Sequence, residues 1–141
     1  MKKIVLIICL CLIPVSGWGQ GFERVSDIRA FCDEFMDQIV RADFQAAFDS
    51  TKSFWPVPEV EVDGIVNQVK QQWPLMENRF GSSLGAEWIR GKRIGASFLR
   101  YYFLHKFEKH AIQWQMDFYK PQDYWIINGI TFEVDLNPLY E

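Results

Sequence analysis

Cysteine, charge of one sign and long apolar runs are all scarce in this chain of 141 residues. Three cysteines are too few for a disulfide scaffold. Lys and Arg number 15 against 18 Asp and Glu, a net charge of −3, so the basic field that favours nucleic-acid binding is absent. Apolar residues make up 49 % of the chain and aromatic residues 16 %, which excludes a disordered protein. This length accommodates one domain.

Catalytic and cofactor-binding motifs are missing as well. We find no glycine-rich phosphate loop, no zinc-ligand spacing and no Ser–His–Asp arrangement. The only two histidines, His105 and His110, have no cysteine or carboxylate neighbours on the face they share, which makes a metal site improbable. The sequence therefore predicts no cofactor, no metal and no assignable catalytic residue.

The longest apolar run, residues 4–13, follows a positively charged start and ends at Pro14. It is shorter than the about 20 residues that a bilayer span requires, and its layout is typical of a secretory signal peptide. Small residues before Gln20 predict cleavage there, so residues 1–19 would be removed and the protein would be secreted or periplasmic. An uncleaved membrane anchor is the main alternative, and a lipoprotein is a weaker one.

The expected mature chain, residues 20–141, is a single domain with 13 basic and 18 acidic side chains, a net charge of −5. The acidic excess lies in residues 20–80, because residues 81–141 carry seven charges of each sign. Cys32 is then the only thiol, so no internal disulfide can form. Its place on an apolar helix face predicts that it is buried.

The first half of this domain has helical periodicity. Ser26 can cap a helix whose apolar residues recur at spacings of three and four, and Asp43 can cap a second helix over residues 44–48. A third helix is predicted over residues 59–73, where Pro74 would stop or kink it, and Gly81 can end a last helical turn near Phe80. The apolar face of the first helix is Ile28, Phe31, Cys32, Phe35, Ile39 and Ala42.

The second half alternates with the period of a strand, most clearly over residues 98–107, 110–119 and 124–136. We expect an α+β fold, with N-terminal helices packed on a curved antiparallel sheet of about four strands. Asn128-Gly129 indicates a bulge or a tight hairpin within the last strand. The bulge is favoured because the apolar phase, with Ile126 and Ile130, continues across it.

The register of the two clearest strands follows from their patterns. The more apolar positions of both strands share one face only if Glu108 and Lys109 form the turn. Phe103 then lies opposite Trp114. On the other face Arg100 lies opposite Asp117, and this pair of opposite charges supports the register independently.

This order of elements resembles the nuclear transport factor 2-like fold, in which a sheet curls into a cone around its helices. More specifically, four segments are similar to a group of small secreted proteins of that fold with no assigned activity. The resemblance covers about residues 26–136, and it implies a pocket between the first helix and the sheet and a homodimer formed through the sheet. It carries over no active-site residue. The four segments are residues 42–48, the loop 55–59, the break at 80–81 and residues 102–120.

The concave face of the predicted sheet is the candidate ligand site, although its Phe, Trp and Met side chains can also fill the interior completely. Its polar members, His105, Asn128 and Tyr101, could mark a ligand. The alternatives are a hydrogen-bonded core histidine for His105, capping of the backbone at its own bulge for Asn128, and aromatic packing for Tyr101. The face contains no carboxylate, so an enzyme would need His105 as its base. The candidate ligand-binding residues are Tyr101, Phe103, His105, Trp114, Met116 and Asn128. Leu99, Phe118, Ile126 and Phe132 complete the face.

The opposite face mixes aromatic and charged residues, which is typical of an interface. We expect a homodimer through it, or else cover by the C-terminal tail 137–141 or by the Trp55 loop. A small basic cluster around Gly91 is expected in a solvated hairpin. The candidate interface residues are Arg100, Tyr102, Asp117, Tyr119 and Trp125, with Ile127 beside them, and the basic cluster is Arg90, Lys92 and Arg93.

Three functions are compatible with these patterns. The first is a secreted, non-enzymatic module that binds a small apolar ligand or a protein partner. The second is a small lyase or isomerase that uses His105. The third is a structural, envelope-associated protein without a ligand.

Overall fold

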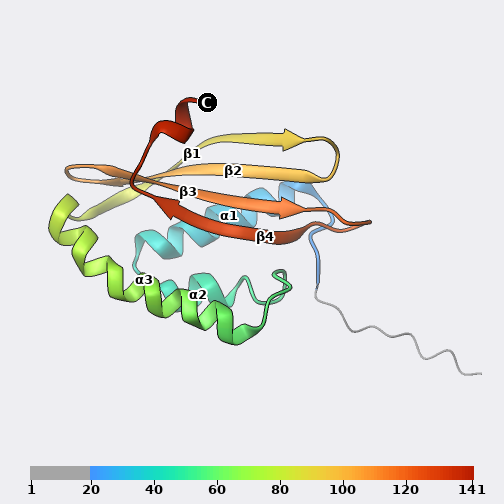
Figure 1. Ribbon diagram of the computed structural model, residues 1–141, viewed down its shortest axis with the longest axis horizontal. Helices are drawn as coiled ribbons and strands as arrows, with labels where there is room; N and C mark the ends of the chain where they lie inside the picture. The colour runs from blue at the N-terminus through green and yellow to red at the C-terminus, as the bar shows by residue number, and fades with distance from the viewer. Residues whose placement is uncertain (1–19) are drawn as a thin grey trace, which may run out of the picture.

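The computed structural model describes residues 20–141, so the predicted signal peptide lies outside the described residues. Three helices cover one face of a single antiparallel sheet with strand order β1-β2-β3-β4 (Figure 1). The α+β prediction is therefore confirmed. The elements are α1 (Val25–Val40), α2 (Phe44–Asp49), α3 (Glu59–Phe80), β1 (Ser83–Ile94), β2 (Phe98–Phe107), β3 (Ala111–Tyr119), β4 (Ile126–Glu133) and the short 3-10 helix η1 (Asn137–Tyr140).

Two predicted helix caps have different outcomes. Helix α1 begins one residue before Ser26, and Arg24 is its N-cap residue, so the prediction of a Ser26 cap is wrong. Arg24 instead donates hydrogen bonds to both carboxylate oxygens of Asp27, at 3.1 and 3.0 Å, which ties the chain to the first turn. The Asp43 cap of α2 is confirmed, since Asp43 Oδ1 accepts a hydrogen bond from the backbone N–H of Ala46 at 3.3 Å.

Helix α3 continues through Pro74 to Phe80, where Gly81 follows its last turn as predicted, so of the two effects predicted for Pro74 the stop is wrong. A proline inside a helix removes one backbone hydrogen bond and costs about 3 kcal/mol. Pro74 faces solvent, whereas Trp73, Met76 and Phe80 are buried on the other side of the helix. Burial of these three large side chains on both sides of the proline offsets its cost.

The predicted register of β2 and β3 is confirmed, with Phe103 opposite Trp114 and Arg100 opposite Asp117. The backbone N–H of Phe107 donates to the carbonyl oxygen of His110 at 2.9 Å and closes the turn. Nε and Nη2 of Arg100 each donate to one carboxylate oxygen of Asp117 at 2.8 Å. This two-bond geometry fixes the pair across the strands.

The predicted bulge in β4 is also confirmed, because Gly129 pairs with Asp117 and Ile127 with Phe118, which leaves Asn128 unpaired. Its effect on the strand was predicted wrongly. One extra residue shifts the alternation by one position, so Trp125 and Ile127 face the helices and are buried, at 3 % and 1 % exposure. Ile126, predicted to face the helices, lies on the other side of β4.

Strand β1 takes in the whole basic cluster, so the predicted hairpin at Arg90, Lys92 and Arg93 is wrong. The turn lies between Ile94 and Phe98, and Arg90 pairs with Tyr102. Two irregularities in the β1–β2 pairing, between Ser83 and Gly85 and between Trp88 and Arg90, interrupt the alternation by which a strand is recognised.

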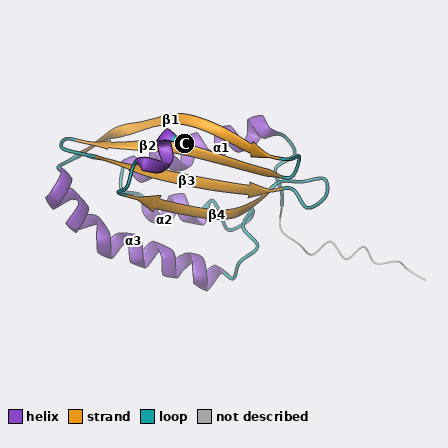
Figure 2. Cartoon of the chain, turned by 45° about the horizontal axis from the view of Figure 1, so that its top comes forward, coloured by secondary structure: helices purple, strands orange, loops and turns teal. Residues whose placement is uncertain are grey.

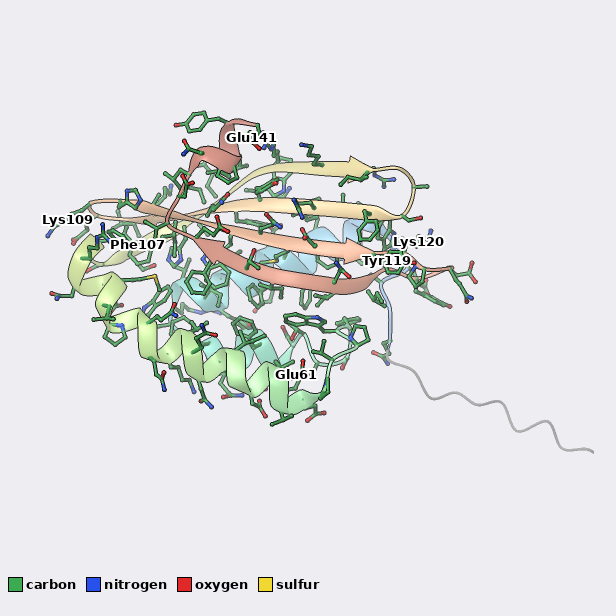
Figure 3. All side chains as sticks on the ribbon, in the orientation of Figure 1. Glu61, Phe107, Lys109, Tyr119, Lys120 and Glu141 are labelled. Atoms are coloured by element: carbon green, nitrogen blue, oxygen red, sulfur yellow. The ribbon has the colours of Figure 1, made fainter. Side chains whose placement is uncertain are left out.

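The core lies between the helices and the sheet face they cover, which we call the inner face. Figure 3 shows aromatic and aliphatic side chains filling the space between these two layers. The Phe35 ring lies at the centre, 5.2 Å from the Phe48 ring and 6.0 Å from the Trp114 ring between centroids. Cys32 is fully buried, as predicted, and desolvation raises the pKa of its thiol.

Candidate functional site

The predicted ligand-binding residues divide between the core and the surface. Tyr101, Phe103, His105, Trp114 and Met116 all lie on the inner face and are buried, with exposures between 0 and 6 %. They are in large part packed core. Trp114 and Phe103 each also line a groove at the edge of that core. Asn128 is exposed in the β4 bulge and lines a groove on the opposite, outer face.

His105 is sealed among other side chains. Its ring stacks on Phe107 with centroids 4.4 Å apart and lies 5.4 Å from the Trp73 ring, and Nε2 is hydrogen-bonded to Ser83 Oγ at 2.7 Å. Burial lowers the pKa of His105 to about 4. None of the grooves described below includes it. The ring is therefore neutral near pH 7 and is out of reach of a substrate, which deprives the enzyme alternative of its base.

A groove of about 370 Å³ opens between α3 and the edge strand β4, and we call it the α3–β4 groove. Helix α3 runs beside the β4 edge of the sheet (Figure 2). The helix wall comes from residues at spacings of three and four, which places them in one stripe. The groove is lined by Ile65, Gln68, Val69 and Gln72 of α3, by Phe48 of α2, by Trp114 of β3, and by Ile130, Thr131 and Phe132 of β4.

Trp114 lies at the bottom of this groove and is closed off from solvent. The side chain is fully buried, with its ring 4.8 Å from that of Phe132 and supported from below by Phe35. Its indole Nε1 is buried and has no hydrogen-bond partner. A buried polar group without a partner costs about 1–3 kcal/mol. Nε1 is closed off by the surrounding side chains, and it is one of five buried side-chain polar atoms without a partner in the described part of the chain.

The rest of the α3–β4 groove is neutral. None of its lining residues is charged, and its polar residues Gln68, Gln72 and Thr131 are all exposed at the rim. The lining holds no carboxylate, histidine, lysine or cysteine that could transfer a proton or act as a strong nucleophile. Chemically, the groove can bind an apolar molecule and orient it, but it offers no catalytic group.

A larger groove of about 510 Å³ follows the loop around Trp55, beside Pro121 and Ile126. None of its lining residues has a buried polar atom without a partner. Its one cation, Lys52, already lies 2.9 Å from carboxylate oxygens of Asp49 and Asp63. Size alone does not mark a ligand site, and the α3–β4 groove is the better candidate for an apolar ligand because none of its lining residues is charged.

The predicted interface residues do not form one surface. Arg100, Asp117 and Tyr119 are half-buried on the outer face, but Trp125 belongs to the core because of the β4 bulge. Tyr102 lies on the outer face at only 5 % exposure. The prediction that Tyr102 and Trp125 are interface residues is therefore wrong, because both side chains are buried within the folded chain.

The C-terminal segment covers the part of the outer face around Tyr102. Arg90 lies over the Tyr102 ring at 5.0 Å and donates a hydrogen bond from Nη2 to the carbonyl oxygen of Pro138 at 2.9 Å. Figure 2 shows η1 on the face of the sheet opposite α1 and α2, and the labelled end at Glu141 stands above that face in Figure 3. The alternative to a dimer, in which the C-terminal tail covers the outer face, is therefore observed for the part of the face around Tyr102.

Comparison of the chain with protein-family models, with curated proteins and with solved structures finds no match. The function is therefore inferred from the geometry of the site. No helix within residues 20–141 has the length and apolar character needed to cross a membrane. In the same part of the chain, no three His, Cys, Asp or Glu side chains are grouped so that they could hold a metal ion.

Proposed function

We propose that this protein is a secreted, non-enzymatic module that binds a small apolar or amphipathic molecule in the α3–β4 groove. The observation that carries the proposal is a groove of about 370 Å³ whose walls are apolar and whose only polar lining residues, besides the indole of Trp114, are the exposed Gln68, Gln72 and Thr131 at its rim. Known ligand sites have volumes of about 300–1,000 Å³ and combine apolar walls with a few placed polar groups. The signal-like pattern of residues 1–19 supports export.

The proposal includes the nuclear transport factor 2-like fold that the sequence resembles. Three helices on one face of a four-stranded antiparallel sheet are compatible with it. The centre of the sheet is filled by Phe35, Trp114 and Met116, so the implied pocket between the first helix and the sheet is reduced to a groove of about 250 Å³ between α1 and β1, which includes Phe103. The larger α3–β4 groove lies at the β4 edge.

Filling the groove tests this function. We expect Ile65→Trp to weaken binding of the neutral fluorophore N-phenylnaphthylamine at least tenfold, because Ile65 is a half-buried wall residue and the indole would occupy the groove. Leu75→Trp is the matched control, since Leu75 lies on the same helix at 70 % exposure and outside the groove. A fluorescence titration measures both affinities. Equal binding by the Ile65→Trp variant, with folding verified by circular dichroism, would place the site elsewhere.

A second candidate function is self-association through the half of the outer face that η1 does not cover. This open patch consists of Ile94 at 61 % exposure, Phe98 at 39 % and the Tyr119 ring, which stacks on Phe98 at 4.9 Å. Arg100 and Asp117 border it in a groove of about 310 Å³. Two copies related by a two-fold axis would bury these apolar side chains against each other.

For this homodimer, we expect Phe98→Lys to convert the protein to monomers, because each interface would then bury two uncompensated charges. Val60→Lys is the control, since Val60 is 75 % exposed on α3 and outside the open patch. Sedimentation velocity at high micromolar concentration gives the oligomeric state. A monomeric wild-type protein in that range would exclude the dimer and would leave the ligand-binding proposal intact.

A further inference from the structure

From the position of Gln20, we infer that the N-terminus of the mature protein is a pyroglutamate whose neutral ring lies at the groove along the Trp55 loop. The inference rests on the export part of the proposed function, because it requires cleavage of the predicted signal peptide before Gln20. It adds a covalent modification, and it gives an occupant to a groove that is separate from the proposed ligand site.

Cleavage before Gln20 would give this residue both a nucleophile and an electrophile. Its free α-amine attacks Cδ of its own side-chain carboxamide, so that a bond forms between the amine nitrogen and Cδ and the Cδ–Nε2 bond breaks. Nε2 leaves as ammonia with one proton from the amine, and a five-membered lactam remains. The step needs no second reactant, and it removes the positive charge of the terminus. Gln20 is exposed, so its side chain has room to fold back on its amine.

The two residues after Gln20 fix where this terminus lies. The backbone N–H of Phe22 donates to the carbonyl oxygen of Trp125 at 2.8 Å, and the N–H of Trp125 donates back to the carbonyl oxygen of Phe22 at 2.9 Å. The Phe22 side chain is buried. A Cβ added at Gly21 would overlap Cβ of Tyr124, so only glycine lets the chain approach the sheet this closely. These contacts hold Gln20 beside the groove, which it lines.

The groove suits a neutral ring better than an ammonium group. Lys52 is the one charged residue among its described lining residues, and its Nζ already lies 2.9 Å from carboxylate oxygens of Asp49 and Asp63. The described lining therefore offers no carboxylate to an N-terminal ammonium group. A lactam ring is uncharged, and its carbon atoms can pack against proline and aromatic side chains. The apolar part of the lining consists of Phe54, Trp55, Pro56, Val57, Pro58, Pro121 and Ile126.

Peptide mapping of the exported protein tests the modification. The full-length chain is expressed in its host, recovered from the extracytoplasmic fraction, warmed at neutral pH and digested with trypsin, which releases residues 20–24 as the N-terminal peptide. We expect this peptide to be lighter than its sequence requires by about 17 Da, the mass of ammonia, and to resist Edman degradation because it has no free amine. The Gln20→Met variant is the matched control. Its side chain has a similar length but no carboxamide, so its peptide should keep the full mass and a free amine.

Nuclear magnetic resonance of the mature protein tests where the ring lies. Nuclear Overhauser effects should connect the ring protons of residue 20 with protons of side chains that line the groove. The Gly21→Ala variant should lose these contacts and still lose ammonia, because the added methyl group would overlap Tyr124 and displace the terminus.

A peptide that begins at Gln20 with its full mass and a free amine would overturn the modification, while export would stand. Loss of ammonia without contacts to the groove would overturn the position of the ring. A mature chain with a different first residue would overturn the inference together with the predicted cleavage site. None of these outcomes changes the binding of N-phenylnaphthylamine by the wild-type and Ile65→Trp proteins, which tests the α3–β4 groove separately.

Discussion

Replacement of Phe35 with alanine is expected to lower the free energy of unfolding by about 3–5 kcal/mol, the usual cost of truncating a large aromatic side chain in a core. The Phe35 ring is fully buried and meets Phe48 of α2 at 5.2 Å and Trp114 of β3 at 6.0 Å. Phe35 therefore joins α1, α2 and the sheet. Its removal would leave a cavity that these three elements cannot close together.

Urea denaturation followed by circular dichroism measures this loss. Phe35→Leu is the matched variant, and it should recover most of the stability because it keeps the site apolar and largely filled. A loss below about 1.5 kcal/mol for Phe35→Ala would contradict a packed aromatic centre at this position. Because Phe35 supports Trp114 from below, the alanine variant should also bind N-phenylnaphthylamine more weakly in the α3–β4 groove.

The register of β2 and β3 could be predicted because both strands keep an unbroken alternation. Residues 112–118 separate apolar from polar positions completely, and a slip of one residue would place Gln115 and Asp117 among the helices. The Arg100–Asp117 pair then had to lie across the strands, as the structure has it. Strong period-two patterns on two adjacent strands constrain each other, so no knowledge of the helices was needed.

The errors lie where a backbone irregularity breaks the period. The Asn128 bulge was recognised from its sequence, but the change of face that follows from it was not, so Trp125 and Ile127 were assigned to the outer face. Strand β1 has two such irregularities and three glycines, Gly85, Gly91 and Gly95, within or next to it. In helix α3 the local sequence was misleading in another way. Pro74 favours a helix end, but burial of the side chains on both sides of it keeps the helix continuous.

The candidate site was only partly accessible from the sequence. Trp114 belonged to the predicted set, but Gln68 and Gln72 of α3 and Thr131 of β4 did not. A groove between a helix and an edge strand depends on the distance and angle at which the two elements pack, and no local period determines these. The unpaired indole N–H is likewise a property of the folded chain, because it depends on which acceptors lie within reach of Trp114.

Acidification from pH 7 to pH 4 is expected to remove up to about 3 kcal/mol of folding stability through His105 alone. Burial lowers the pKa of His105 in the folded protein to about 4, against an ordinary value of 6.5. Between these two pH values the unfolded chain binds a proton at this residue and the folded chain does not. Stability therefore falls as the pH drops below 6.5 and stops falling on this account below about 4.

The His105→Gln variant isolates this contribution. Glutamine is neutral at every pH in the range and can still hydrogen-bond Ser83 Oγ, which lies 2.7 Å from the histidine Nε2. Urea unfolding of both proteins at steps between pH 7 and pH 4 gives the difference in stability, in which the effects of the carboxylates cancel. That difference should change in favour of the variant as the pH falls.

A pH-independent difference between wild type and the His105→Gln variant would mean that His105 is hydrated or paired when protonated, contrary to its packing against Phe107 and Trp73. The same outcome would reopen the enzyme alternative, because a histidine that can be protonated near neutral pH is one that solvent can reach. The expected result instead makes His105 a structural residue. Ligand binding at the α3–β4 groove should then be independent of the protonation of His105, since that residue is not part of the groove.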